Sequence, residues 1–548
     1  MTDCKKIAEL IFSDIDKTTE YYEELYPARN LPEGARVTRF APSPTGYLHF
    51  GGLYAGFASK LTADTTGGVF MLRIEDTDKK REVEDGVTGI VTGLKAFGVG
   101  PDEGVTGFNT EYGDYGPYTQ SHRREIYRTF AKKLMEEGKA YPCFCTPEDL
   151  DEIRAKQENE DIKGYYGSYA KCRDLTDDEI IEKVNNGVPF TVRLRSEGDI
   201  QRKIKFEDMI KGKIEMSENV NDVVILKADG IPTYHFAHAV DDHLMRTTHV
   251  VRGDEWIASV PTHIELFRAL GNKPLKYAHI APIMKEENGG KRKLSKRKDP
   301  EANVSFYIEK GYPEAAVKEY MLTILNSNFE EWRKANKTED ISKFPFNLKK
   351  MSVSGALFDM VKFNDVSKNV ISVMTAKEVY KLVTEWAMEY NEVLYALFVD
   401  DKEKATAILN IDRENPKPRK DIACWEEVEN YISFFYNELY SADYTLPENI
   451  SKADAVEILT KYKEVYSADD SKEEWFNKIK ELCTACGYTP NVKEYKQNPD
   501  AFKGHVGDVS TVIRIAITSR TNTPDLYYIM QILGKDEVMR RIDNMIEG

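Results

Sequence analysis

A strand–turn–helix–strand pattern in residues 36–75 constrains the fold more than any other part of the chain. VTRFA is a β-prone run, PSPTG is a turn, LYAGFASKLTADT is an amphipathic helical segment, and VFMLRI is typical of a buried strand. Elements in this order form a βαβ unit, with which a parallel nucleotide-binding sheet begins. The sequence therefore predicts an α/β domain near the start of the chain.

The connection RFAPSPTGYLHFGG, residues 39–52, has the features of a phosphate site. A helix that starts after a proline-fixed turn leaves its first N–H groups unpaired, and such a terminus favours an anion. Gly51 and Gly52 remove side chains where a base or ribose would approach the backbone. His49 can donate a hydrogen bond to a phosphate oxygen. An incidental histidine in a surface turn is the common alternative, but the place in the βαβ unit favours binding.

A second candidate is the basic run KRKLSKRKD at residues 291–299. Lys293 and Lys296 flank Ser295, and the glycine pair upstream predicts a mobile loop. Mobile ammonium groups can neutralise the phosphates of a departing pyrophosphate. A solvated charge run is the usual alternative for such a cluster.

Length, charge and cysteine use limit the classes of protein that fit. At 548 residues the chain predicts three to five domains, and its net charge of −16 argues against an indiscriminate nucleic-acid binder while allowing local basic patches. No apolar stretch approaches the roughly 18–20 residues of a membrane span, and the acidic N-terminal segment has no signal-peptide core. Seven scattered cysteines indicate reduced thiols and a cytoplasmic protein. The protein is expected to be a monomer without a membrane partner.

Six short motifs in order carry a resemblance to a known family. They are RFAPSPTG, RIEDTD at 73–78, DGIPTYH at 229–235, DDHLM at 241–245, VVRGDEW at 250–256 and KLSKRK at 293–298. PSPTGYLHFGG resembles the first signature of class I aminoacyl-tRNA synthetases, His-x-Gly-His, and KLSKR resembles the second, Lys-Met-Ser-Lys-Ser. The whole set resembles glutamyl-tRNA synthetase of the bacterial type. The resemblance implies ATP-dependent activation of L-glutamate to glutamyl-adenylate, with Mg²⁺ sharing the phosphate charge. Transfer to tRNA(Glu) would then release AMP, with diphosphate released in the first step.

The resemblance also implies roles for individual residues. His49, Lys293 and Lys296 would be catalytic, and ATP would contact His49, Gly51, Gly52, Lys293, Ser295 and Lys296. Glutamate would contact Arg39, Ala41, Ser43, Glu75, Tyr234, His238 and Arg252. By position in the family, Arg419 in KPRKD would lie near the anticodon.

Two of these assignments can be weighed from the residues themselves. A dicarboxylate substrate requires fixed guanidinium groups, and Arg39 and Arg252 each end a strand that is expected to be buried. His238 stands where the family commonly has Asn, and a protonated ring there would add positive charge near the substrate. The recognition of the glutamate side chain therefore depends on the state of His238.

Two metal-site hypotheses arise from the sequence. A hydrolase-like cluster would use His235, His238, His243, Asp241 and Asp242, but the resemblance explains this segment without a metal. Cys143, Cys145 and Cys172 are spaced as in zinc-bearing members of the family. The fourth ligand is not evident, because Asp174 follows Cys172 and Tyr166 or Tyr169 is only approximately placed. Three unpaired thiols are favoured over bound zinc, and Cys483 and Cys486 are expected to serve helix packing.

The predicted fold is a Rossmann-type class I synthetase catalytic domain with an α+β insertion, followed by an all-α anticodon-binding region. The predicted parts are a helical extension that packs against the catalytic domain (1–35), the two halves of the catalytic domain (36–118 and 222–270), an acceptor-end-binding insertion (119–221), a stem-contact segment with the KLSKR loop (271–365) and two helical anticodon-binding domains (366–450 and 451–548).

Three rival functions remain open at this level. Glutaminyl-tRNA synthetase typically has Pro-Glu-Pro-Asn-Gly in the first signature and β-barrel anticodon domains. A tRNA-modifying relative lacks the anticodon region, so the last ~180 residues disfavour it. A catalytically silent paralogue would have lost the signature histidine or lysines, which are all present. Whether tRNA(Gln) is charged besides tRNA(Glu) depends on a few anticodon contacts.

Overall fold

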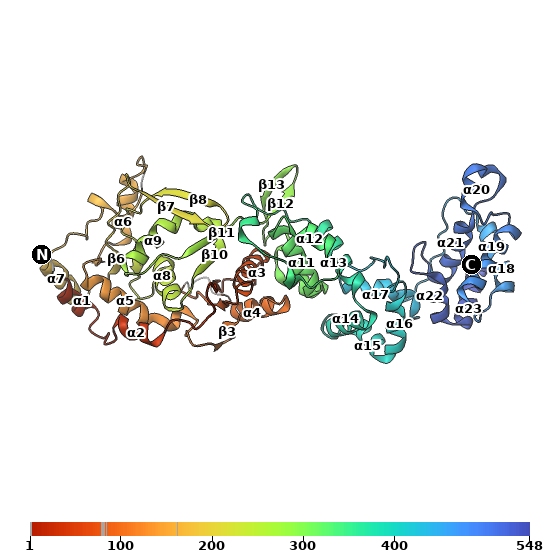
Figure 1. Cartoon of the computed structure of the whole chain (residues 1–548), viewed down its shortest axis with the longest axis horizontal. Coiled ribbons are helices and arrows are strands. Elements are labelled where there is room, and N and C mark those ends of the chain that lie inside the picture. The colour runs from red at the N-terminus through yellow and green to blue at the C-terminus, as the bar shows by residue number, and fades with distance from the viewer. Residues whose placement is uncertain (1–2, 78–82, 84, 162) are drawn as a thin grey trace. The chain divides into compact units, whose positions relative to one another are not determined.

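The computed structural model describes residues 3–77, 83, 85–161 and 163–548 (Figure 1). Asp78, the last residue of the RIEDTD motif, lies outside the described residues. The chain forms two compact units, Met1–Ile308 with Lys318–Asp359 and Glu309–Val317 with Met360–Gly548. The finer seven-part division stays a prediction.

The predicted βαβ unit is present in the first compact unit. β1 (Val37–Phe40) and β2 (Val69–Leu72) are parallel with Arg39 opposite Met71, and α3 (Phe50–Asp64) connects them. β3 (Glu103–Gly107) and β4 (Thr110–Tyr112) complete the sheet in the order β1-β2-β3-β4, and α4 (Gly86–Ala96) precedes β3. Gly68 is required before β2, because a Cβ there would lie 1.9 Å from the carbonyl oxygen of Arg36.

A second sheet continues the catalytic core. β10 (His249–Gly253) and β11 (Lys276–Ile280) are parallel. α8 (Tyr234–Leu244) precedes β10, and α9 (Val260–Ala269) lies between the two strands in sequence. The backbone N–H of Thr248 donates to the carbonyl of Val37 over 2.9 Å, which places β10 beside β1. β7 (Lys203–Asp208) is parallel to β11 and carries the antiparallel β8 (Gly212–Ser217). Strands from the predicted insertion therefore extend the catalytic sheet.

The rest of the insertion forms a smaller α+β layer. β5 (Ala140–Cys143) and β6 (Thr191–Leu194) make an antiparallel sheet with β9 (Val224–Leu226), which lies just after the predicted insertion. Its helices are α5 (Arg124–Glu136), α6 (Pro147–Lys156) and α7 (Asp177–Asn185). The N-terminal α1 (Cys4–Ile11) packs on α5, a helix of the predicted insertion, rather than on the predicted catalytic domain. After α2 (Thr19–Leu25), Arg29 does reach the catalytic domain, where it donates to the carbonyl of Met245.

The basic run lies at the end of a two-stranded hairpin. β12 (Met284–Glu287) and β13 (Gly290–Lys293) pair antiparallel, so that Lys293 closes the hairpin opposite Met284. α10 (Val304–Lys310), α11 (Glu314–Leu325) and α12 (Phe329–Ala335) follow. The backbone N–H of Val304 donates to the carbonyl of Leu48 over 3.1 Å, which brings this segment to the start of α3.

The second unit is helical around one apolar core, in agreement with the predicted all-α region (Figure 1). Its helices are α13 (Met360–Val373), α14 (Ala376–Tyr390), α15 (Glu392–Asp400), α16 (Lys402–Asn410), α17 (Glu426–Ile432), α18 (Lys452–Val465), α19 (Lys472–Ala485), α20 (Val492–Gln497), α21 (Val506–Thr518), α22 (Leu526–Leu533) and α23 (Lys535–Glu547). Among the described residues, no helix combines the length and the apolar character that crossing a membrane requires.

Candidate active site

A cavity of about 400 Å³ opens at the ends of β1, β10 and β11, beside the first turn of α3. Ligands of open α/β sheets bind at such strand ends. We call it the strand-end pocket. Of the residues predicted for the site, it is lined by Arg39, Ala41, Ser43, His49, Gly51, Gly52, Glu75, Tyr234, Arg252 and Lys293. His238, Ser295 and Lys296 are not among its lining residues.

His49 has two roles that its geometry separates. Its Nδ1 accepts a hydrogen bond from the backbone N–H of Gly51 over 2.8 Å and so caps α3. A Cβ at Gly51 would lie 3.0 Å from the same nitrogen, so glycine also makes room for the imidazole. Burial, followed by the charges of Lys296 and Lys293, lowers the pKa of His49 to about 4. The ring is therefore neutral at pH 7, with its proton on Nε2, where it can donate to a ligand.

The basic run is a folded loop, and Asp299 organises it. The Asp299 carboxylate accepts from Arg292 over 2.6 and 2.8 Å, from Lys285 over 3.1 Å and from the backbone N–H of Ser295 over 2.9 Å. Hydrogen bonding from Arg292 holds the pKa of Asp299 well below its usual range. Lys296 reaches back to the carbonyl of Tyr47, and burial lowers the pKa of its ammonium group. Sequence reasoning missed Asp299, although an acid at the end of a basic run was a visible signal.

Arg252 lies at the end of β10 and lines the strand-end pocket. Its guanidinium donates to His279 Nε2 (3.1 Å), Tyr234 Oη (3.2 Å), His263 Nδ1 (3.2 Å) and the carbonyl of Trp256 (3.4 Å). Among the described residues, no carboxylate forms an ion pair with it. The positive charge of Arg252 is thus available to an anionic ligand.

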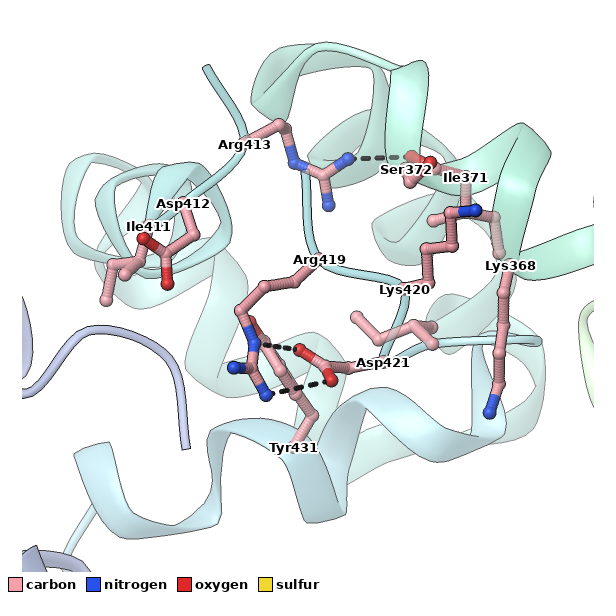
Figure 2. A pocket seen from close by; sticks show the side chains of 11 residues that line it. Lys368, Ile371, Ser372, Ile411, Asp412, Arg413, Arg419, Lys420, Asp421 and Tyr431 are labelled. Atoms are coloured by element: carbon pink, nitrogen blue, oxygen red, sulfur yellow. Dashed lines mark hydrogen bonds and ion pairs between the residues drawn. The ribbon is translucent and has the colours of Figure 1, made fainter. Parts of the chain in front are cut away.

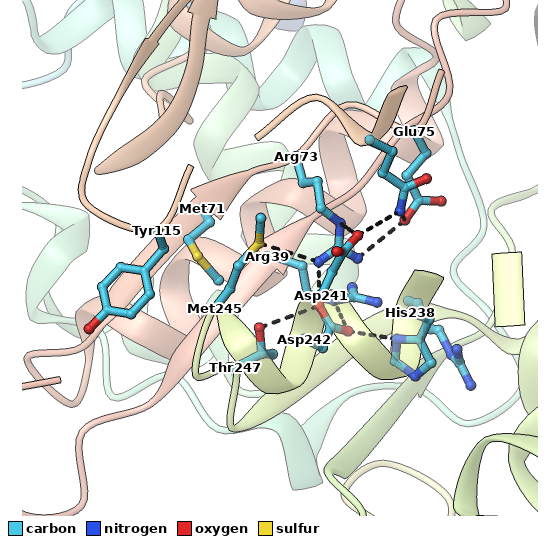
Figure 3. Close-up of polar contacts among 12 residues, drawn as sticks. Arg39, Met71, Arg73, Glu75, Tyr115, His238, Asp241, Asp242, Met245 and Thr247 are labelled. Carbon is cyan, nitrogen blue, oxygen red and sulfur yellow. Dashed lines mark hydrogen bonds and ion pairs between the residues drawn. The ribbon is translucent and has the colours of Figure 1, made fainter. Parts of the chain in front are cut away.

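A buried charge network lies behind the pocket (Figure 3). Arg39 Nε donates to Asp242 Oδ2 over 3.0 Å, and Arg73 bridges Asp242 (2.5 Å) and Glu75 (3.2 Å). Asp241 is bound by Arg123 Nε over 2.7 Å. Three guanidinium groups thus balance three carboxylates in a region that excludes water, as buried charges require.

Glu75 is the carboxylate of this network that also lines the pocket. Burial, opposed by the neighbouring Arg73, raises its pKa to about 7. An ammonium group placed beside it would favour the ionised form. Glu75 is therefore suited to bind a cationic group at neutral pH.

His238 is fully buried behind the pocket. Its Nδ1 lies 2.6 Å from Asp242 Oδ2, and its Nε2 lies 3.2 Å from Tyr277 Oη (Figure 3). Burial lowers the pKa of His238 to about 3, so the ring is neutral at pH 7. The protonated His238 that the sequence suggested is thus disfavoured, and the ring bears on the pocket through Asp242 and its partner Arg39.

Arg419 lies in the second unit, in a shallow basic depression that Lys368, Arg413 and Lys420 also line (Figure 2). Its guanidinium is held by Asp421 through Nε (2.7 Å) and Nη2 (3.0 Å). Arg413 donates to the carbonyl of Ile371 over 2.7 Å. The arginines are fixed by protein contacts, and the lysines add positive charge around them.

The predicted cysteine cluster is brought together. The sulfur atoms of Cys143, Cys145 and Cys172 lie within 4.8 Å of one another, the only group of three or more metal-ligating side chains among the described residues. Tyr165 Oη lies 3.2 Å from Cys145 Sγ and accepts from the N–H of Cys172 over 3.0 Å.

The fourth group at this cluster is therefore Tyr165, whereas Tyr166 and Tyr169 both donate to Glu160 and Asp174 pairs with Arg195. The alternative cluster on α8 is not assembled, because His243 pairs with Glu23 and His235 contacts His263. Cys483 and Cys486 are buried in the core of the second unit, as expected for helix packing.

Comparisons with known proteins agree with this arrangement. Residues 36–365 match the family described as tRNA synthetases class I (E and Q), catalytic domain, and residues 493–546 match an anticodon binding domain. A glutamate–tRNA ligase of Acetivibrio thermocellus is 50% identical over 99% of this chain and 100% of its own. One of Clostridium beijerinckii is 49% identical over 99% of both chains.

A solved structure of a similar protein has the same fold. The crystal structure of a glutamate tRNA ligase from Elizabethkingia meningosepticum in complex with its amino acid is 29% identical. It superposes with a TM-score of 0.73 over 93% of this chain and 99% of that one. The likeness spans both compact units. The chain therefore belongs to the glutamate–tRNA ligases, within the class I tRNA synthetases.

Proposed function

We propose that this chain activates L-glutamate with ATP in the strand-end pocket and transfers the glutamyl group to tRNA(Glu). One observation carries the proposal. A neutral histidine donor at a helix N-terminus, next to two lysines, shares one cavity with an arginine that has no acidic partner among the described residues. The first set suits phosphates and the second suits a carboxylate.

The first step is attack of the glutamate α-carboxylate oxygen on the α-phosphorus of ATP. The new O–P bond forms glutamyl-adenylate as the bond to pyrophosphate breaks. His49 Nε2–H donates to a phosphate oxygen as charge develops, and the ammonium groups of Lys293 and Lys296 balance the leaving pyrophosphate. Lys296 exchanges its contact with the carbonyl of Tyr47 for a phosphate oxygen. Gly51 and Gly52 lie where the nucleotide would approach the backbone.

Glutamate carries two carboxylates and one ammonium group, and the pocket offers groups of matching charge. We assign Arg39 and Arg252 to the carboxylates, with Tyr234, Ala41 and Ser43 lining the same surface. We assign Glu75 to the ammonium group, because its buried carboxylate follows β2 and lines the same pocket as the two arginines. His238 supports Arg39 through their shared partner Asp242.

Mg²⁺ is proposed to enter with ATP. Mg²⁺ binds mainly through substrate phosphates and water in nucleotide enzymes, so the phosphate oxygens of ATP would supply its ligands.

The cysteine cluster itself fits zinc, since three thiolates and the Tyr165 hydroxyl can complete a tetrahedral set. Elemental analysis of the purified protein and of Cys145→Ser tests this. One equivalent of zinc in the wild type and less in the variant supports the site, whereas none in either leaves three structural thiols.

The helical unit and Arg419 are proposed to bind the anticodon region of the tRNA. The lysines around Arg419 supply positive charge for a nucleic-acid backbone within an acidic chain. We propose a monomeric cytoplasmic enzyme, in keeping with seven cysteines that are all free thiols.

The decisive experiment is charging of purified tRNA with radiolabelled glutamate, run beside ATP–pyrophosphate exchange in the presence of tRNA. Charging of tRNA(Glu) with glutamate, and not with glutamine, is expected. No charging of any tRNA would overturn the proposal and favour a silent paralogue. Parallel assays with tRNA(Gln) show whether that substrate is accepted too.

A further inference from the structure

A buried series of hydrogen bonds reaches Arg252 from the insertion. Nε of Arg252, on β10, donates to Nε2 of His279 on β11 over 3.1 Å. On the other edge of that ring, Nδ1 of His279 lies 2.6 Å from Oδ2 of Asp208, the last residue of β7. Asp208 and His279 are 1% and 0% exposed, so water does not compete for these contacts.

The guanidinium determines which nitrogen of His279 carries the proton. Arginine can only donate, so Nε2 of His279 must accept, and the proton of the neutral ring must lie on Nδ1. Burial lowers the pKa of His279, which keeps the ring neutral at pH 7. Nδ1–H then donates to Asp208. The opposite tautomer would turn an N–H toward the N–H of Arg252 and repel it.

Asp208 is surrounded by hydrogen-bond donors. Its Oδ1 accepts from the backbone N–H groups of Ile210 (2.9 Å) and Lys211 (2.8 Å), and its Oδ2 accepts from the backbone N–H of His279 (3.1 Å) and from the ring. A carboxylate satisfies these donors with both oxygens. An amide would turn its NH₂ group toward donors on one side or the other.

We propose that Asp208 is a positioning residue of the amino-acid side of the pocket: it holds the tautomer of His279 that orients the Arg252 guanidinium toward the substrate carboxylate. The proposal rests on the assignment of Arg252 to that carboxylate. It explains how a guanidinium is held in place without an acid that would neutralise it. It also means that β7, from the segment assigned to acceptor-end binding, contributes to the amino-acid site.

Asp208→Asn tests the proposal, because it changes one buried atom and keeps the side-chain shape. We expect the KM for glutamate to rise about tenfold or more, the KM for ATP to stay unchanged, and kcat to change less. Asp222→Asn is the matched control. Asp222 is likewise fully buried and accepts from Tyr141 over 2.6 Å and from the N–H of Ser196 over 2.8 Å, but it does not contact His279 or Arg252. Its KM for glutamate should equal that of the wild type.

Variants of His279 test whether Asp208 acts through it. His279→Phe keeps a ring but removes both nitrogens, and should raise the KM for glutamate as Asp208→Asn does. His279→Gln offers a donor and an acceptor at opposite ends and should restore part of the loss. Asp208→Asn should add little in the His279→Phe background. ¹⁵N NMR of labelled histidines should show the proton of His279 on Nδ1 in the wild type and on Nε2 in Asp208→Asn.

The outcomes separate this proposal from the proposed function. Absence of glutamate charging by the wild type would overturn the function itself. If the wild type charges tRNA, a wild-type KM for glutamate in Asp208→Asn would overturn the positioning role, and so would multiplying effects of Asp208→Asn and His279→Phe. Should Asp208→Asn not fold, equal KM values for His279→Gln and His279→Phe would overturn it instead.

Discussion

Two histidines in different units of this enzyme cap a helix in the same way. His49 caps α3 by accepting from the N–H of Gly51 over 2.8 Å, and His505 caps α21 by accepting from the N–H of Gly507 over 2.9 Å. In both places a Cβ on the glycine would lie within about 3 Å of the imidazole, at 3.0 Å for Gly51 and 2.6 Å for Gly507. The His-x-Gly pattern therefore has a local structural cause.

The surroundings of the two histidines differ. His505 closes a capping box, in which its own N–H donates to Asp508 over 2.8 Å. His49 has Lys293 and Lys296 as neighbours, and its ring faces the strand-end pocket. The acid beside His505 completes a helix cap, whereas the cations beside His49 give its surroundings the positive charge that suits a phosphate. Helix capping explains the His-x-Gly pattern at both sites, and the lysines beside His49 distinguish the site that we propose to bind phosphate.

Alanine at each position should give the largest contrast. His49→Ala removes a donor to the phosphates, and we expect kcat for ATP–pyrophosphate exchange to fall about 10²–10³-fold. His505→Ala should leave kcat within twofold in the same assay. His49→Asn is the control that keeps a capping acceptor for Gly51. Activity near wild type in His49→Asn would mean that capping, rather than donation from Nε2, is what the reaction needs.

Removing the Lys296 ammonium group should make the surroundings of His49 more like those of His505. Lys296→Ala is expected to lower kcat about 10²-fold, because the pyrophosphate loses a balancing charge. It should also raise the pKa of His49 above about 4, since a nearby cation disfavours the imidazolium. NMR titration of His49 measures this, with His505 as the internal reference. An unchanged pKa of His49 would contradict the placement of Lys296.

The pH dependence should separate Glu75 from His49. The folded-state pKa of Glu75 is raised to about 7, so the ionised form that binds an ammonium group is present above that pH and is lost as the pH falls. We expect kcat/KM for glutamate to fall about tenfold between pH 8 and pH 6. His49, with a pKa of about 4, does not titrate in this window. In Glu75→Gln, kcat/KM for glutamate should be low at all pH values. If kcat/KM of this variant still falls between pH 8 and pH 6, another group causes the pH dependence.

The shared capping role should give the smallest effect. Loss of either cap costs about 1 kcal/mol of helix stability, so amide exchange in the first turn should quicken about fivefold. We expect this at α3 in His49→Ala and at α21 in His505→Ala. Hydrogen exchange with mass spectrometry resolves the two helices. A change at one helix only would show that the two caps are not equivalent.

Much of the site was predictable because its parts are local in sequence. The βαβ order of residues 36–75 and the helical character of the C-terminal part follow from periodicity and breakers that act within about ten residues. The helix of that unit was expected from Leu53, whereas α3 begins at Phe50 because His49 caps it. Most of the residues that the motif resemblance assigned to the site line one cavity, although His238, Ser295 and Lys296 do not. The protonation state of His238 could not be predicted in this way, because a sequence shows a histidine but not the burial that keeps it neutral.

The sequence by itself determined the family, the order of the elements and the residue types that we propose to meet phosphate and glutamate. Only the tertiary structure decided that Asp299 folds the basic loop, that Tyr165 rather than Tyr166 joins the cysteines, and that Asp208 reaches Arg252 through His279. Helix caps and strand patterns are set by neighbours along the chain. Contacts between side chains on different strands depend on register and topology, which no short stretch of sequence encodes.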